Sequence, residues 1–100
     1  MAKEVFLTQL AVDNYENIIE YLIDKWGVTS ANNFIDRFSE IRILLSESPE
    51  LFSFEDKIKQ VRKCVITKHN TLYFKETVDS IRILTIFDTR QNPDKLNSVF

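Results

Sequence analysis

The spacing of apolar residues changes near position 50, and this change limits the folds open to the chain more than any other feature. Before it, apolar side chains recur at the intervals of one helix face. They form two seams, Tyr15, Ile18, Ile19, Leu22 and Trp26, then Ala31, Phe34, Phe38, Ile41 and Leu45. The first half of the chain is therefore predicted to be helical.

Boundary residues divide this region into two helices. Asp13 with Glu16 is a start signal for the first helix, and Gly27, the single glycine of the chain, is a stop signal. The second helix is predicted from residue 29 or 30 to a point before Pro49. Because so few residues join the two helices, they are expected to be antiparallel neighbours in a helical hairpin.

The second half has the character of a β-sheet. Three runs of β-branched and aromatic residues lack helical spacing, at 60–67, 71–77 and 80–88. Turn residues at 68–70 and 78–80 separate them, so they are predicted to form an antiparallel meander. Residues 3–8 add a strand before the helices, and a short tail or helical turn follows Asn92-Pro93-Asp94. The order strand-helix-helix-strand-strand-strand predicts one α+β domain over residues 1–100, with the hairpin packed on a small antiparallel sheet.

The net charge of −2 conceals an uneven distribution. Residues 1–56 hold 4 Lys/Arg and 11 Asp/Glu, a balance of −7, whereas residues 57–100 hold 9 and 4, a balance of +5. An anionic partner is therefore expected to contact the second half, which supplies the predicted sheet. The same charges would also suit an ordinary solvated surface.

Composition excludes several classes of protein. One cysteine cannot form an internal disulfide, and no cluster of Cys and His has the spacing of a zinc site. Neither a cofactor nor a metal is expected. The apolar runs are shorter than the roughly 18–20 residues that span a bilayer, and the first residues do not resemble a signal peptide. We therefore expect a cytoplasmic protein without membrane contact.

Four residues that often take part in chemistry have simpler structural explanations here. Trp26 lies on the apolar face of the first helix and Cys64 on a predicted strand, so both are expected in the core. His69 lies in a predicted turn without a carboxylate beside it in sequence, which favours a solvated turn residue over a catalytic one. Tyr73 lies in mid-strand, on the face opposite to that of Leu72, and is expected to pack across the sheet.

Several short segments are informative through their order and spacing. They are Leu10-Ala11 with Ile18, Ile19 and Leu22; Trp26 to Ala31 with Phe34; Leu51-Phe52; Leu72-Tyr73-Phe74; and Ile83 to Pro93. Together they resemble the RelE/ParE toxin superfamily of bacterial type II toxin–antitoxin systems, of the ParE-like, plasmid stabilisation type. The resemblance implies the α+β fold predicted above and a cognate antitoxin whose flexible segment folds on the toxin surface. The resemblance does not decide the oligomeric state, which could be a homodimer or a toxin–antitoxin hetero-oligomer.

The superfamily contains two activities. RelE-like members cut messenger RNA in the ribosomal A site, and ParE-like members inhibit DNA gyrase. By resemblance to RelE-like members, the catalytic candidates would be Arg62, Lys63 and Arg90. However, Thr71 stands where an arginine is expected before Leu72, and the tail has no tyrosine. A nuclease built on these residues would have charge stabilisation but no evident acid or base.

The ending of the last predicted strand favours the other activity. The segment Phe87 to Asp94 resembles the ParE-like ending. The resemblance therefore implies a toxin that binds gyrase, with Arg62, Arg82, Asp88 and Arg90 as target-binding residues. A degenerate toxin that keeps the fold and binds only its antitoxin would fit the same sequence.

Overall fold

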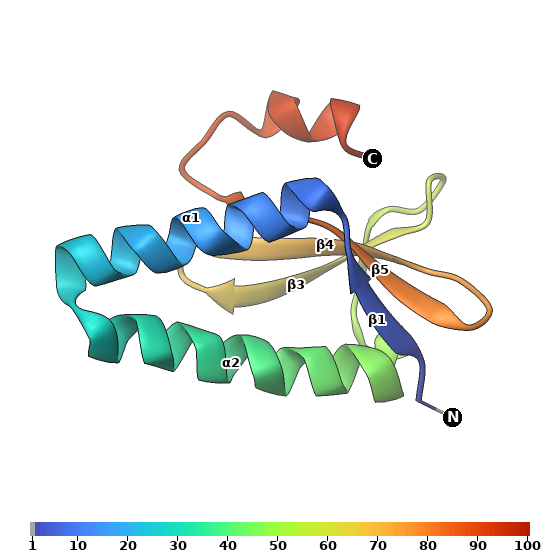
Figure 1. Ribbon diagram of the computed structural model, residues 1–100. Helices are drawn as coiled ribbons and strands as arrows, with labels where there is room; N and C mark the ends of the chain where they lie inside the picture. The colour runs from blue at the N-terminus through green and yellow to red at the C-terminus, as the bar shows by residue number, and fades with distance from the viewer. Residues whose placement is uncertain (1) are drawn as a thin grey trace.

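The computed structural model describes residues 2–100. In chain order its elements are β1 (Glu4–Leu7), α1 (Gln9–Trp26), α2 (Val28–Glu47), η1 (Pro49–Leu51), β2 (Phe54–Asp56), β3 (Val61–Thr67), β4 (Asn70–Glu76), β5 (Ser80–Asp88) and η2 (Pro93–Ser98), where η marks a 3-10 helix (Figure 1). The predicted α+β order is confirmed. The short elements η1 and β2 are additions that the sequence pattern did not reveal.

The strands form one five-stranded sheet in the order β1-β5-β4-β3-β2. β3, β4 and β5 are the antiparallel meander that the sequence predicts. β1 pairs with β5 in parallel, with Val5 opposite Ile81, so the sheet is mixed rather than wholly antiparallel. This pairing satisfies the backbone groups of β5 that β4 leaves free, which makes β5 an interior strand.

The first helix begins at Gln9, earlier than the predicted start at Asp13, because Thr8 is its N-cap. The Thr8 hydroxyl accepts the Ala11 N–H at 3.1 Å and donates to the Leu84 carbonyl oxygen at 2.7 Å. The same side chain therefore ends β1, starts α1 and attaches the helix to β5. Asp13 lies inside the helix, where its carboxylate accepts a hydrogen bond from the Gln9 amide.

Gly27 joins the two helices. Its φ of 95° lies in the left-handed region, which glycine adopts without the steric cost of a Cβ atom. Its N–H donates to the carbonyl oxygens of Leu22 and Ile23, which closes α1, and α2 starts at the next residue, Val28. The helices run antiparallel along one face of the sheet, as predicted (Figure 1).

The main core lies between the hairpin and the sheet. The predicted seam of α2 matches the buried residues of that helix, which are Ala31, Phe34, Phe38, Ile41 and Leu45. They pack with strand residues that include Leu72, Phe74 and Cys64. Cys64 is therefore a core residue as predicted, and burial raises the pKa of its thiol.

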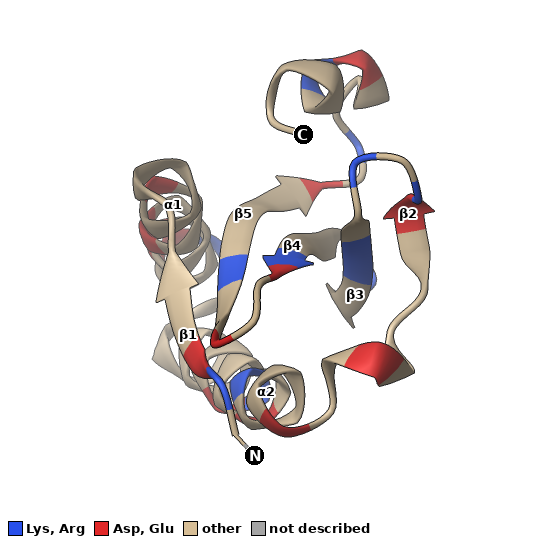
Figure 2. Ribbon diagram, turned by 90° about the vertical axis from the view of Figure 1, so that its right-hand side faces the viewer, with Lys and Arg blue, Asp and Glu red and all other residues tan. Residues whose placement is uncertain are grey.

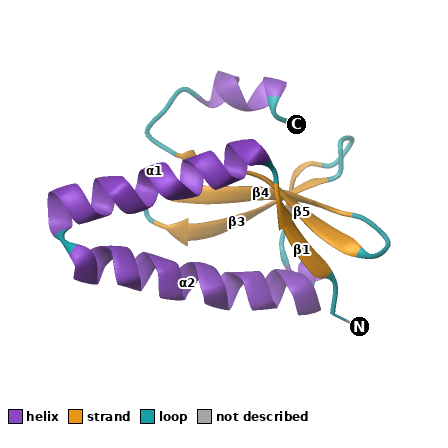
Figure 3. Cartoon of the chain, viewed as in Figure 1, coloured by secondary structure: helices purple, strands orange, loops and turns teal. Residues whose placement is uncertain are grey.

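Trp26 does not lie in the core, contrary to the prediction. It is the last residue of α1 and is 71% exposed. The hairpin extends past the strands at that end (Figure 3), so no sheet covers the last turn. The apolar spacing identifies the inward face of α1, but it does not tell where the opposing layer ends.

A smaller apolar cluster lies on the other face of the sheet, under the tail. Tyr73, Leu84 and Phe87 pack there with Leu96 of η2. The Tyr73 ring lies 5.1 Å from the Phe100 ring, centroid to centroid. The predicted packing role of Tyr73 is confirmed, and burial raises the pKa of its hydroxyl. Within residues 2–100, neither helix has the length and apolar character needed to cross a membrane.

Candidate partner-binding groove

A groove of about 860 Å³ lies between α1 and the chain that follows β5. Three exposed apolar side chains of α1 line it, Leu10, Tyr21 and Trp26, with exposed fractions of 44%, 45% and 71%. The facing wall is formed by the end of β5 and by Leu96 and other residues of the tail. The exposure of Trp26 thus gives the groove an aromatic side chain that a partner would cover.

The charged lining of the groove is mostly basic. Arg37 of α2, His69 of the β3–β4 turn, Arg90 after β5 and Lys95 of η2 all line it, and Asp88 is the single carboxylate among its lining residues. The protein as a whole carries a net charge of −2, so this surface differs in sign from the molecule. Apolar side chains beside a basic rim fit a partner segment that is both acidic and apolar.

Asp88 and Arg90 form the best-defined polar contact in the groove. The Arg90 guanidinium donates from Nε to Asp88 Oδ1 at 3.0 Å and from Nη2 to Oδ2 at 2.8 Å. Asp88 Oδ1 also accepts the Arg90 backbone N–H at 2.9 Å, so the turn and the side chains hold each other. The hydrogen bond from Arg90 lowers the pKa of Asp88, and the same bond raises the pKa of Arg90.

His69 lies in a turn, as predicted, but it is half-buried and lines the groove. Its carbonyl oxygen accepts the Thr89 N–H at 2.9 Å, which connects the β3–β4 turn to the end of β5. His69 lies close enough for a charge on its ring to lower the pKa of Asp88 further. The sequence does supply a signal for this proximity, because an antiparallel meander places the turn before β4 next to the end of β5.

Arg62 lies away from the groove and is held by β2 and the chain before it. Its guanidinium donates to the Phe52 carbonyl oxygen at 2.5 Å and lies 4.0 Å from the Phe54 ring centroid. In the sheet register Arg62 is opposite Phe74, which in turn is opposite Ile83. Since a strand rises about 3.3 Å per residue, Arg62 is aligned with a point roughly 16 Å before the Asp88 end of β5.

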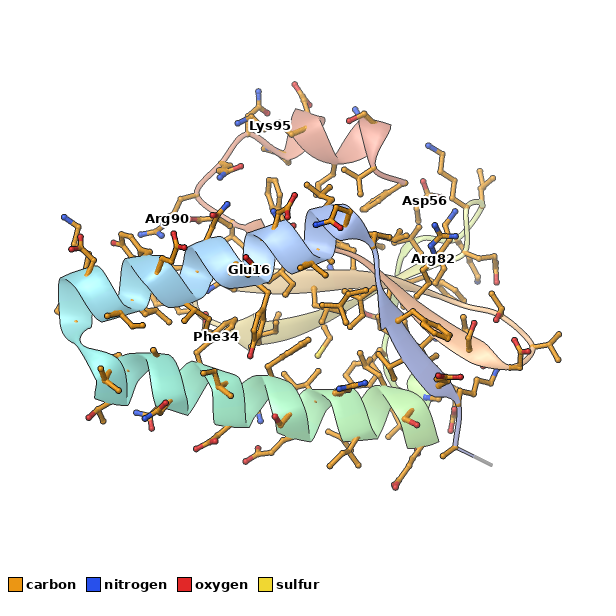
Figure 4. All side chains as sticks on the ribbon, viewed as in Figure 1. Glu16, Phe34, Asp56, Arg82, Arg90 and Lys95 are labelled. Carbon is orange, nitrogen blue, oxygen red and sulfur yellow. The ribbon has the colours of Figure 1, made fainter. Side chains whose placement is uncertain are left out.

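The remaining sequence candidates also lie apart from Arg90. Lys63 pairs with Glu55 of β2 at 3.5 Å. Arg82 is exposed and lies between two helix-facing residues of β5, so it points to the opposite face of the sheet, in register with Lys75. Figure 4 shows Arg82 at the opposite end of the molecule from Arg90. Of the four predicted target-binding residues, two share the groove, Asp88 and Arg90.

Comparison with known proteins identifies the family. Residues 5–93 match the family model described as ParE toxin of type II toxin-antitoxin system, parDE. The chain belongs to the ParE toxin family.

Two solved structures have similar folds. The chromosomal ParDE toxin–antitoxin system from P. aeruginosa matches with a TM-score of 0.73 at 16% identity, over 87% of this chain and 96% of that one. The YoeB dimer from Staphylococcus aureus matches with a TM-score of 0.63 at 10% identity, over 87% and 97%. A search of curated proteins finds no match.

Family membership confirms the resemblance predicted from the sequence, and it makes this chain the toxin-family member of a toxin–antitoxin system. The matched residues of this ParE-family chain include the Asp88–Arg90 turn, whereas most of the tail lies beyond them. No group of three or more His, Cys, Asp or Glu in residues 2–100 is placed to hold a metal ion.

Proposed function

We propose that this ParE-family chain inhibits bacterial growth by binding DNA gyrase rather than by cutting RNA, and that a cognate antitoxin silences it. The observation that carries the proposal is the state of the three nuclease candidates. Arg62, Lys63 and Arg90 each contact a partner within the chain, on two different parts of the sheet. Cations that are already paired and lie apart favour a binding surface over a catalytic centre.

The Asp88–Arg90 turn is the proposed contact with the target. Asp88 accepts from two donors of the guanidinium, and Tyr21 of α1 also interacts with the Arg90 side chain. A guanidinium has five N–H donors, so Arg90 can hold these contacts and still donate to a partner. The pairing fixes the Arg90 side chain before binding, which reduces the entropy that association costs.

Charge reversal tests this contact. Arg90→Glu is expected to reduce growth inhibition without unfolding the domain, because Arg90 is exposed and its loss removes no core contact. Lys25→Glu is the matched control. Lys25 is exposed and precedes the groove residue Trp26 in the last turn of α1, but it does not line the groove itself. Circular dichroism would establish that both variants fold. Full inhibition by a folded Arg90→Glu protein would remove Arg90 from the proposed site.

The antitoxin is proposed to place an acidic, flexible segment in the groove. Such a segment would cover Tyr21 and Trp26 and approach the cations of the rim, Arg37 and Lys95. Titration calorimetry with the cognate antitoxin should give a lower affinity at about 1 M salt than at about 0.1 M, because salt screens exposed charges. An affinity that does not change with salt would contradict the ionic part of the proposal.

The experiment that separates the activities follows synthesis in cells. The protein is induced without its antitoxin, and pulse-labelled DNA and protein synthesis are measured in the first minutes. DNA synthesis is expected to fail first if gyrase is the target. If protein synthesis fails first, the gyrase proposal is wrong. If neither changes, the chain is a degenerate toxin that keeps only its binding role, or the host lacks its target.

A second candidate is a RelE-like mRNA endoribonuclease, and one observation favours it. His69 lines the same groove as Asp88 and Arg90, so a group able to transfer protons lies near a cation. Early loss of protein synthesis that disappears in a His69→Ala variant would support this candidate over the first.

A further inference from the structure

The β2–β3 hairpin presents an isolated apolar side chain between two lysines. Its tip is Lys57-Ile58-Lys59, and Ile58 is 96% exposed. Both lysines are exposed, and neither forms an ion pair with any residue in 2–100. In Figure 4 Asp56, at the start of the tip, is labelled at the right of the molecule and Arg90 at the left, and Figure 2 shows the turn between β2 and β3 with its lysines in blue.

The tip is held in one conformation by local contacts. Asp56 Oδ1 accepts the Lys59 backbone N–H at 2.9 Å, and the Gln60 amide donates to the Lys57 carbonyl oxygen at 2.6 Å. Gln60 has a φ of 60°, a left-handed conformation that a residue with a side chain adopts at a cost. The loop thus accepts an unfavourable backbone angle and still keeps Ile58 pointing into solvent.

The base of the hairpin is anchored as well. Arg62 of β3 is in register with Phe54 of β2, and its guanidinium lies over that ring. The same guanidinium holds the Phe52 carbonyl oxygen, and Lys63 pairs with Glu55 across the two strands. Because the tip is held by its own hydrogen bonds and its base is anchored to the strands, the hairpin loses little conformational freedom on binding, which favours affinity.

The β4–β5 hairpin provides a comparison within the same chain. Its tip residue Val78 is also 96% exposed, but Thr77 and Asp79 flank it. Exposure of one apolar side chain is therefore not special here. The pair of unpartnered lysines is what distinguishes the Ile58 tip, and it implies a partner surface of negative charge.

We propose that the β2–β3 tip is a second contact with the toxin's protein target, in which Ile58 enters an apolar pocket bordered by carboxylates that pair with Lys57 and Lys59. The inference rests on the proposed function, since it assumes that the chain acts by binding a protein. A branched aliphatic side chain fits a protein pocket, whereas an aromatic side chain would be expected for stacking on nucleic acid bases. A single isoleucine is also too small an anchor for a membrane surface.

The test compares two charge insertions at equally exposed positions. Ile58→Asp and Val78→Asp are assayed for binding to purified DNA gyrase and for growth inhibition on induction. Ile58→Asp is expected to weaken binding about ten-fold or more, the size of effect seen for interface anchors, and Val78→Asp to leave it within about two-fold. A Lys57→Glu and Lys59→Glu double variant should slow association at low salt.

The outcomes separate this inference from the proposed function. If Ile58→Asp binds and inhibits like Val78→Asp, with both folded by circular dichroism, the hairpin contact is wrong and the gyrase proposal stands. If the unmodified chain inhibits growth without binding gyrase, the gyrase proposal is wrong, and growth inhibition alone decides the hairpin contact. Binding to DNA is measured as well, in a gel-shift assay. If Ile58→Asp loses binding to DNA and keeps binding to gyrase, the hairpin contacts nucleic acid, and the choice of a protein partner is wrong.

Discussion

Replacement of Arg62 by alanine should destabilise the domain rather than remove a contact with the target. Two interactions are lost, a hydrogen bond from a charged group to the Phe52 carbonyl oxygen and the stacking on Phe54. The first contributes about 1.5–3 kcal/mol and the second about 0.5–1 kcal/mol in proteins generally. Because the arginine is only half-buried, we take the lower ends, which sum to about 2 kcal/mol.

Urea unfolding followed by circular dichroism measures this change. Lys63→Ala is the matched control, because an exposed ion pair such as that with Glu55 contributes about 1 kcal/mol at most. In a thermal scan, a loss of about 2 kcal/mol lowers the melting temperature of a domain of this size by roughly 10 °C. If the free energy of unfolding of Arg62→Ala lies within about 0.5 kcal/mol of that of the unmodified protein, the contacts of Arg62 with Phe52 and Phe54 do not stabilise the fold.

The consequence for activity follows from the total stability. Domains of this size are stable by about 5–15 kcal/mol, so Arg62→Ala should remain almost entirely folded. Its growth inhibition should therefore fall less than that of Ile58→Asp. A greater loss in a folded Arg62→Ala protein would show that Arg62 takes part in target binding, either by direct contact or by anchoring the β2–β3 hairpin.

Two further predictions concern single hydrogen-bonding groups. Thr8→Ala should lower the free energy of unfolding in urea by about 2 kcal/mol, about 1 for the helix cap and about 1 for the hydrogen bond to Leu84. Thr8→Ser keeps the hydroxyl and should recover most of this loss, so equal stability of the two variants would contradict the capping role. Arg90 lowers the pKa of Asp88 in the folded state. The pair therefore stabilises the protein fully at pH values above 3.8, the ordinary pKa of Asp, and this contribution is lost as the pH falls through the lower folded-state pKa. Asp88→Asn should thus be less stable than the unmodified protein at about pH 7, and the gap should narrow as the pH falls below 3.8; a gap that does not narrow in acid would contradict the assignment.

Local periodicity predicted the parts of the fold that depend on one face of one element. The α2 seam from Ala31 to Leu45 was predicted residue by residue, because a helix that packs on a sheet buries one continuous stripe. The start of α1 was placed too late, since Thr8 ends a strand and caps a helix at once and the Asp13 signal was stronger in sequence. Trp26 was misplaced because spacing carries no information on the extent of the opposing layer.

The candidate site depends on contacts between distant parts of the chain. Arg90 could be placed after the last strand from sequence, but its partner Asp88 emerges from the geometry of the turn. The predicted meander already places the His69 turn beside the end of β5, whereas Tyr21 reaches the same groove through helix packing, which no local sequence pattern encodes. The family resemblance implies a target-binding role for Arg62, and this stays a prediction; the sequence does not show that its guanidinium also holds the Phe52 carbonyl oxygen beside β2.

The parallel pairing of β1 with β5 has a consequence for protein synthesis. β1 is translated before β5, so it waits for residues 80–88 before its backbone groups find partners in that strand. At about 5–20 residues per second, this leaves the nascent chain without a complete sheet for several seconds. The groove between α1 and the end of β5 therefore cannot form until residues 80–88 have left the ribosome, and a partner that needs the groove meets only the completed sheet.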